Sequence, residues 1–304
     1  MLQIIGPMAT FNLDDITTKE RHTKLLGAIG PRPIALVSTV DKYGNNNLSP
    51  YSFFNIFSSN PPVVIFSPAR RVRDNTTKDT LHNCIVQKEC VVNMVSYDVA
   101  QQVNLSSAEY DSSVDEFVKS GLTPVDSEVV QAKRVKESPV SLECEVRDIF
   151  HLGEEGGAGN LVMCLIKRIH IADRVLAEDG GIDQEEIDLV GRMGRHWWVR
   201  ASGDALFKLS PPPVGIGVDE IPDVIRRSTI LTGNNLGQLG AVTVLPTDAE
   251  IEDMKNDFDV RRILQNFTDG IELREQLHEM AKELLDNDQV HEAWKVLLID
   301  KSAR

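Results

Sequence analysis

Five short segments rich in β-branched and aliphatic residues follow one another within the first 171 residues, and turns separate most of them. They occupy residues 33–40, 62–67, 90–96, 140–146 and 161–171. Residues 140–146 alternate apolar and polar side chains, which is typical of an antiparallel strand with one buried face. Helices are fewer in this part and are expected at residues 18–26 and 77–87. The pattern therefore favours a mainly β barrel with peripheral helices over a doubly wound sheet.

The pattern changes after the three prolines at 211–213. Apolar residues recur every third or fourth position within residues 249–285, which indicates two amphipathic helices. A third helix is expected over residues 290–299. We therefore predict one domain of residues 1–215 and a mostly helical extension of residues 216–304.

The chain is acidic, with 46 acidic and 32 basic side chains and a formal net charge of −14. Such a protein repels nucleic acid and anionic membrane surfaces, so neither is an expected partner. Residues 247–304 hold 15 acidic and 8 basic residues, which is half of the acidic surplus. A site that binds an anion is therefore expected upstream of them.

The four cysteines stand apart in the sequence, without a C-x-x-C pair or a histidine at ligand spacing. Neither a disulfide nor a metal site is predicted. Cys84, Cys144 and Cys164 lie in apolar segments, where cysteine commonly serves as a small core residue. The first 15 residues lack the pattern of a signal peptide, and no segment approaches the roughly 20 apolar residues of a membrane span. A cytoplasmic protein is therefore expected.

Residues 67–80 gather four basic side chains and several hydroxyls in an otherwise acidic chain. A strand is expected just before this segment and a helix is expected to begin near Thr77. Hydroxyls, Lys78 and the N–H groups of the helix would then converge on a phosphate. The alternative is a solvated loop in which Arg70 and Arg71 are surface charges.

Residues 48–62 alternate aromatic side chains with small hydroxyl-bearing ones. A flat isoalloxazine ring requires such a mixture, because its faces need apolar cover and its rim needs hydrogen-bond donors and acceptors. The alternative is a barrel strand that places Phe53, Phe54 and Phe57 in the core.

Residues 190–200 combine two tryptophans, three arginines and a histidine. Such a cluster either covers a cofactor by stacking and phosphate contacts or packs at a dimer interface, and both alternatives stay open for Trp197. No Rossmann fingerprint, H-E-x-x-H, G-x-S-x-G or P-loop motif is present. Their absence weighs against a dinucleotide-binding Rossmann domain, a zinc peptidase, an esterase and an NTPase.

Together these segments resemble the flavin reductase-like family of FMN-binding split barrels. The family carries R-P-I-A-L-V-S-T, then A-P-Y-S-F-F-N with S-x-P-P, then K-D-T-x-x-N, F-V-V-N and G-R-x-G-G-x-x-Y. The matching segments, in the same order, are residues 31–40, 47–62, 78–83, 90–93 and 191–200. This chain departs from the last motif at Arg195 and Trp198.

The resemblance implies a homodimeric split β-barrel that binds FMN without a covalent link. The predicted cofactor-binding residues are Ser49, Pro50, Tyr51, Ser52, Phe53, Phe54, Ser67, Lys78, Asp79, Thr80, Asn83 and Trp197. In the expected reaction NADH or NADPH transfers a hydride to flavin N5, and this step needs no side-chain nucleophile. No catalytic side chain is predicted, and His196 is considered as a group that orients the nicotinamide.

A second function from another class stays open. In this alternative the chain is a flavoredoxin-like electron-transfer protein that holds FMN but does not oxidise NAD(P)H directly. The acidic helical extension would then dock an electron-acceptor protein through complementary charge. A barrel that has lost its flavin is a third possibility.

Overall fold

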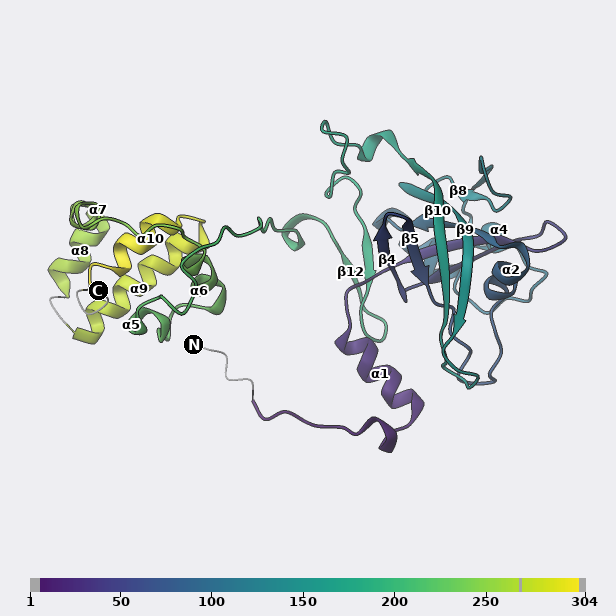
Figure 1. Ribbon diagram of the computed structural model, residues 1–304, viewed down its shortest axis with the longest axis horizontal. Coiled ribbons are helices and arrows are strands. Elements are labelled where there is room, and N and C mark those ends of the chain that lie inside the picture. Colours follow the sequence, from purple (N-terminus) through teal and green to yellow (C-terminus); the bar gives the residue numbers. More distant parts are fainter. Residues whose placement is uncertain (1–5, 268–269, 301–304) are drawn as a thin grey trace. The chain divides into compact units, whose positions relative to one another are not determined.

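The computed structural model describes residues 6–267 and 270–300. The chain divides into two compact units, the first of residues Phe11–Phe207 and the second containing the described residues from Lys208 onward. Figure 1 shows that all labelled strands belong to the first unit, while the second is drawn as helices and loops. The division into residues 1–215 and 216–304 stays a proposal, with the structural boundary lying somewhat earlier in the chain.

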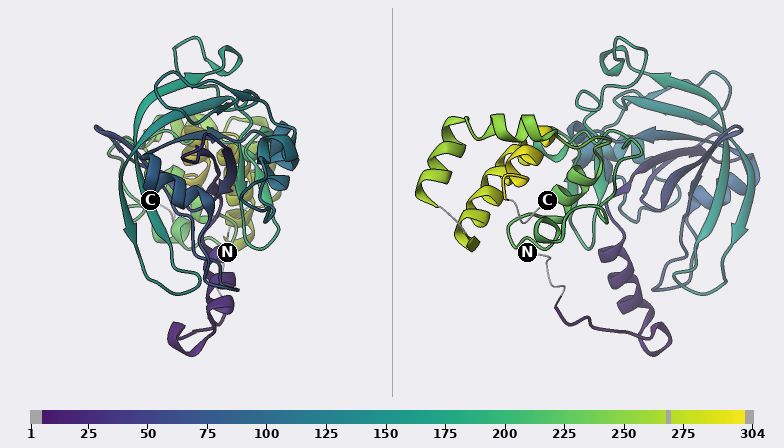
Figure 2. Two further views of the ribbon diagram at one scale, coloured as in Figure 1. Left: turned by 90° about the vertical axis from the view of Figure 1, so that its right-hand side faces the viewer. Right: turned by 60° about the vertical axis from the view of Figure 1, so that its left-hand side comes forward.

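The first unit is built on a seven-stranded antiparallel sheet in the order β3-β2-β6-β9-β10-β5-β4. The strands wrap around one core, as the two views of Figure 2 show. In chain order they are β2 (Ala35–Val40), β3 (Asn46–Tyr51), β4 (Phe54–Ser59), β5 (Pro62–Phe66), β6 (Glu89–Met94), β9 (Val140–His151) and β10 (Asn160–Ile171). This is the split β-barrel with a C-terminal helical extension that the sequence predicts, and the fold class is confirmed.

Two smaller sheets complete the strands of this unit. The first has the order β1-β11-β12 and the second pairs β7 with β8. Their bounds are β1 (Arg32–Pro33), β11 (Val190–Arg192), β12 (Trp198–Arg200), β7 (Pro124–Val125) and β8 (Arg134–Val135). Because β1 runs directly into β2, the pairing of Arg32 with Arg192 fixes the β11–β12 hairpin beside the start of the large sheet.

Short helices surround the barrel. They are α1 (Thr18–Ala28), α2 (Asp79–Gln87), α3 (Ala100–Leu105) and α4 (Glu116–Ser120), with the 3₁₀ turns η1 (Leu13–Asp15), η2 (Tyr97–Val99), η3 (Asp173–Val175) and η4 (Gly203–Ala205). The start of α1 is fixed by a capping box between Thr17 and Glu20. Lys78, at the N-cap of α2, makes no side-chain hydrogen bond to the helix. The first N–H groups of α2 therefore lack the usual capping side chain.

The barrel core is apolar and includes all four cysteines of the chain, each of them buried. Cys90 on β6 and Cys144 on β9 are direct cross-strand partners, and the Sγ atom of Cys90 lies 3.7 Å from that of Cys164. The prediction that Cys84, Cys144 and Cys164 are core residues is confirmed. Residues far apart in sequence thus meet because β6, β9 and β10 are neighbours in the sheet.

The second unit consists of helices around its own apolar core. They are α5 (Asp223–Arg226), α6 (Gly233–Gly240), α7 (Asp248–Met254), α8 (Phe258–Asn266), α9 (Gly270–Asp286) and α10 (Val290–Leu297). The buried Trp294 packs in this core and donates its indole N–H to the Leu239 carbonyl at 3.1 Å. Where the sequence predicts two helices within residues 249–285, the structure has three. Within the described part of the chain, none of the helices has the length and apolar character needed to cross a membrane.

Candidate functional site

Three pockets of the first unit are neighbours that share lining residues, and together they are called the groove. We call them the inner pocket, of about 30 Å³, the middle pocket, of about 140 Å³, and the outer pocket, of about 450 Å³. Ser107 lines both the inner and the middle pocket. Asn104, Arg192 and Trp198 line both the middle and the outer pocket.

The inner pocket holds an amine without a carboxylate partner. Lys78 Nζ lies 3.3 Å from the Ser49 hydroxyl, and no described carboxylate oxygen comes within 4 Å of this nitrogen. Burial and the nearby charge of Arg71 lower the pKa of Lys78. Arg71 also lines the pocket, and its only ion pair in the described structure is with the exposed Glu109, at 3.5 Å. The side of the pocket formed by Lys78 and Arg71 is therefore suited to an anion, although the carboxylates of Asp79, Glu109 and Glu116 also line the pocket.

A buried hydrogen-bond network holds the walls of the inner pocket in place. The Thr80 hydroxyl donates to Asn47 Oδ1 at 2.8 Å, and Thr39 donates to the same oxygen at 3.3 Å. Asn83 donates to the Thr39 hydroxyl at 3.0 Å. Because Thr80 and Asn83 belong to α2 while Thr39 and Asn47 belong to the β2–β3 hairpin, the network fixes the N-terminus of α2 against the barrel. That N-terminus carries a partial positive charge that adds to the attraction for anions.

The middle pocket has an aromatic and polar lining. Pro50, Tyr51 and Ser52 form one wall at the end of β3, and Trp198 contributes its side chain from β12. The Tyr51 hydroxyl is buried beside the hydroxyls of Ser49 and Thr80. Burial raises the pKa of Tyr51, so this hydroxyl stays protonated and can donate a hydrogen bond. Lys78 Nζ lies 5.1 Å from the centre of the Tyr51 ring, which links the middle pocket to the inner one.

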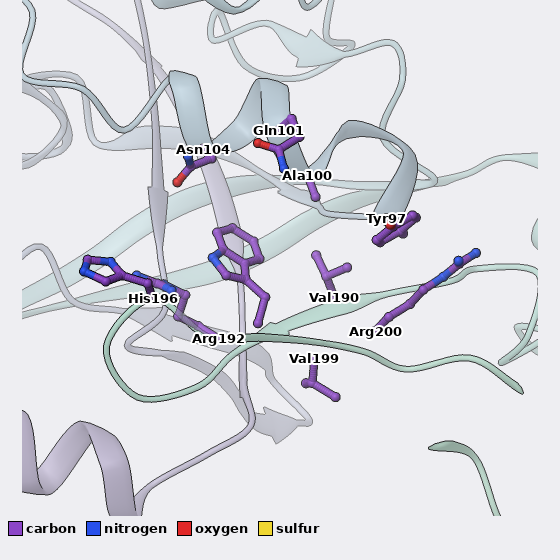
Figure 3. A pocket seen from close by; sticks show the side chains of 10 residues that line it. Tyr97, Ala100, Gln101, Asn104, Val190, Arg192, His196, Val199 and Arg200 are labelled. Atoms are coloured by element: carbon purple, nitrogen blue, oxygen red, sulfur yellow. The ribbon is translucent and has the colours of Figure 1, made fainter. Parts of the chain in front are cut away.

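The outer pocket lies between α3 and the β11–β12 hairpin. In Figure 3, Gln101 and Asn104 project from α3 on one side, while Val190 and Arg192 project from the hairpin on the other. The Arg192 guanidinium carbon lies 5.2 Å from the centre of the Trp198 ring, within the range of a cation–π contact. The pocket therefore combines an aromatic surface, side-chain amides and positive charge.

The structure brings together most of the residues that the sequence nominates. The predicted residues that line the inner or the middle pocket are Ser49, Pro50, Tyr51, Ser52, Lys78, Asp79 and Thr80. His196 lines the outer pocket. The predicted residues that line none of these three pockets are Phe53, Phe54, Ser67, Asn83 and Trp197. Their assignment to the cofactor stays a prediction.

Each residue outside the groove has another environment. The Ser67 hydroxyl accepts a hydrogen bond from the Asn160 backbone N–H at 3.1 Å. Phe54 packs against the barrel core, and Phe53 is 39% exposed. Trp197 is 74% exposed, whereas the next residue, Trp198, lies in the groove.

Several lining residues were not nominated from the sequence. They are Ile34, Asn47, Arg71, Asn104, Ser106, Ser107, Ala108, Glu109, Tyr110 and Glu116. Most of them come from the segment between β6 and β9. The local signal that marks them is the run Ser106–Ser107 followed by Tyr110, which repeats the mixture of hydroxyls and aromatics found at residues 48–62.

The fold and groove define a split-barrel protein with an anion-binding end and an aromatic end. Residues 28–184, just over half of the chain, match the family model described as the flavin reductase like domain, and the chain belongs to this family. An uncharacterized protein of Aquifex aeolicus is 37% identical over 185 residues, which make up 61% of this chain and 92% of that relative.

Solved structures show the same architecture. Component B of nitrilotriacetate monooxygenase from Bacillus cereus is 32% identical, with a TM-score of 0.62 over 67% of this chain and 99% of that one. Flavoredoxin of Desulfovibrio vulgaris is 23% identical, with a TM-score of 0.50 over 59% of this chain and 91% of that one. The second likeness supports the fold alone.

Proposed function

We propose that this chain binds FMN in the groove and works as an NAD(P)H-dependent flavin reductase. The observation that carries the proposal is a cation beside an aromatic pocket. Lys78 is a half-buried cation without a carboxylate partner in the described structure, and Tyr51 and Trp198 line the adjoining middle pocket. A phosphate would pair with the cation, and a flat ring would lie against the aromatic side chains. Membership of the flavin reductase-like family supports the same cofactor.

Different residues of the groove would bind different parts of FMN. Lys78, Ser49 and Thr80, with the N-terminus of α2, would hold the phosphate. Pro50, Tyr51 and Ser52 would border the ring, with Trp198 closing the pocket from the other side. In this arrangement the phosphate would lie in the inner pocket and the ring in the middle pocket. We therefore propose FMN, held without a covalent bond, as the cofactor of the groove.

The protein's part in the proposed reaction is to position the two reacting rings and to exclude water from them. When bound, FMN would supply the hydride chemistry between a nicotinamide donor, NADH or NADPH, and an electron acceptor. The chain then needs to hold two rings in contact and offer hydrogen-bond donors at the ring edge. His196 lines the outer pocket, where it would orient the nicotinamide. No catalytic nucleophile or base is assigned.

A homodimer is part of the proposal. Ile56 and Phe57 on the edge strand β4 are 59% and 64% exposed, although both are large apolar side chains. A second copy covering this edge would remove the apolar surface from water. Sedimentation velocity should therefore show a dimer, and Phe57→Asp should shift the population toward the monomer. A wild-type monomer at all concentrations would contradict this part of the proposal.

Stopped-flow mixing tests the reductase activity. Flavin-loaded protein is mixed anaerobically with NADH or NADPH while the absorption band of oxidised flavin is followed. The proposal expects the band to bleach with at least one donor. If flavin is bound but neither donor bleaches it, the reductase proposal is wrong and the flavoredoxin-like electron carrier, which would receive electrons from a protein partner, takes its place. Protein that stays colourless after addition of FMN would reject both.

The cellular setting also remains a proposal. We propose a cytoplasmic location. All four cysteines have free thiols, which agrees with a reducing compartment. Nucleic acid and membranes are not expected partners of a chain with a net charge of −14. Cell fractionation with an antibody against the chain tests the location, and recovery in the membrane fraction would contradict it.

A further inference from the structure

We infer that the outer pocket binds a planar aromatic carboxylate, recognised jointly by Arg192 and Trp198. The inference deepens the proposed function and rests on it for the position of this ligand, next to the flavin ring. The pocket itself is defined by the chain alone, so its selectivity can be measured separately from reductase activity.

The first argument is unmatched positive charge at the junction of the middle and outer pockets. Arg192 lines both, and no described carboxylate lies within 4 Å of its guanidinium. One of its N–H groups donates to the Trp197 carbonyl at 3.2 Å, which fixes the side chain and leaves other donors unused. Burial lowers the pKa of Arg192, as expected for a cation that is partly removed from water without a counter-charge.

A second guanidinium makes this imbalance larger. Arg32 is the cross-strand partner of Arg192, and it is 7% exposed. Burial, and after it the charge of Arg192, lowers the pKa of Arg32. Its donors are directed at backbone carbonyls, those of Leu26 at 2.9 Å and Met193 at 3.0 Å among them, which carry no full charge. An anion bound at Arg192 would relieve the repulsion between the two arginines.

The second argument limits the anion to a single negative charge. Arg200 also lines the outer pocket, but Asp188 already neutralises it through two hydrogen bonds, at 2.8 and 2.7 Å. Arg200 further stacks on Tyr97, with 4.1 Å between the guanidinium carbon and the ring centre. Of the two arginines that line this pocket, Arg192 alone is left to bind a ligand. One guanidinium matches the geometry of one carboxylate.

The third argument is the shape and polarity of the remaining surface. Trp198 offers an indole face, and Val190 adds apolar contact on the same hairpin. Gln101 and Asn104 project from α3 on the other side of the pocket, as Figure 3 shows, and neither side-chain amide has a hydrogen bond in the described structure. A flat ring would stack on the indole while the amides serve substituents at its rim. The volume of about 450 Å³ accommodates one such ligand.

Benzoate and benzamide test the inference, because they share a ring and differ in charge. Their dissociation constants are measured by tryptophan fluorescence on the full chain, both flavin-free and loaded with FMN. Arg192→Gln removes the cation, and Arg195→Gln is the matched control on the same hairpin, where Arg195 is exposed and outside the pocket lining. Nicotinamide mononucleotide is titrated in parallel as the phosphate-bearing probe.

Benzoate should bind wild-type protein about tenfold or more tightly than benzamide, given the strength of hydrogen bonds to charged groups. Arg192→Gln should abolish this preference, and Arg195→Gln should keep it. Equal binding of the two probes, or a preference that survives Arg192→Gln, would overturn the inference. Tighter binding of nicotinamide mononucleotide than of benzoate, lost in Arg192→Gln, would assign the pocket to a nucleotide and overturn it as well. Bleaching by NAD(P)H is scored separately, so failure of the reductase proposal is distinguishable from either result.

Discussion

Replacement of Lys78 by methionine tests the proposal that the inner pocket binds the phosphate of FMN. Methionine keeps an unbranched side chain that can still contact the Tyr51 ring, but it removes the charge and the donors of the ammonium group. In the native groove this ammonium contacts the Ser49 hydroxyl at 3.3 Å, and no described carboxylate competes for it. One hydrogen bond to a charged group contributes about 1.5–3 kcal/mol. The dissociation constant for FMN should therefore rise about 10- to 100-fold.

Riboflavin provides the internal comparison, because it carries the same ring without the phosphate. Quenching of flavin fluorescence on titration with protein measures both ligands. Lys78→Met should weaken FMN strongly and change riboflavin by less than about threefold. Lys136→Met is the control, since it removes an equal charge from an exposed position on the same unit. Equal losses for FMN and riboflavin would refute the placement of the phosphate at Lys78.

The same lysine predicts the direction of the pH dependence. Burial and Arg71 lower the pKa of Lys78 in the flavin-free protein. The ammonium must be charged to attract the phosphate, so the preference for FMN over riboflavin is present at neutral pH and falls as the pH rises through the pKa of Lys78. The fall should begin below the pH at which a free lysine titrates, about 10.4. A preference that is constant up to that pH would argue against a role for this amine.

Two further predictions concern stability. Burial lowers the pKa of His278 to about 4, so protonation favours unfolding, and the second unit should lose up to about 3 kcal/mol as the pH falls from 6.5 toward 4. Thermal melts followed by circular dichroism at pH 7 and 4.5 should show a smaller pH effect in His278→Gln, and an unchanged effect would contradict the assignment. A Cβ atom on Gly194 would lie 2.9 Å from the Gly27 Cα, so Gly194→Ala should destabilise the first unit by about 1–3 kcal/mol in urea unfolding. Gly27→Ala, whose Cβ meets open space, is the control and should be neutral or slightly stabilising, and equal effects of the two changes would refute the argument.

The strands could be predicted where the alternation of apolar and polar residues is clear. Residues 140–146 show the alternation and form the first part of β9. The strand continues to His151 because β10 pairs with it, for example through Phe150 and Leu161. Most residues of β9 after Val146 are exposed, and they therefore carry no alternation that could mark the extension. Pairing with a distant partner decides the outcome there.

Some lining residues of the groove could be predicted from the sequence, and others could not. Residues 49–52 and 78–80 are local signals, because the aromatic, hydroxyl and basic side chains that line the pockets lie close together in sequence. The contribution of α3 depends on Val103, which packs in one core cluster with Leu36 and Leu48 of the barrel. No local pattern specifies that contact. Asn104 and Ser107 enter the groove as a consequence of it.

The choice between adjacent tryptophans shows the same limit. Composition places two tryptophans side by side in residues 190–200 but does not say which of them faces the groove. Pairing between β11 and β12 sets Trp198 opposite Arg192, and this register directs the Trp198 side chain into the groove. Trp197 precedes the strand and is 74% exposed. A register of this kind is fixed by the fold and cannot be obtained from composition.

The structure of the protein in complex with FMN tests the central claim most directly. We expect the phosphate within hydrogen-bond distance of Lys78 Nζ and Ser49, and the ring in the middle pocket between Tyr51 and Trp198. A flavin that lies elsewhere on the first unit, or a phosphate that does not contact Lys78, would contradict the account.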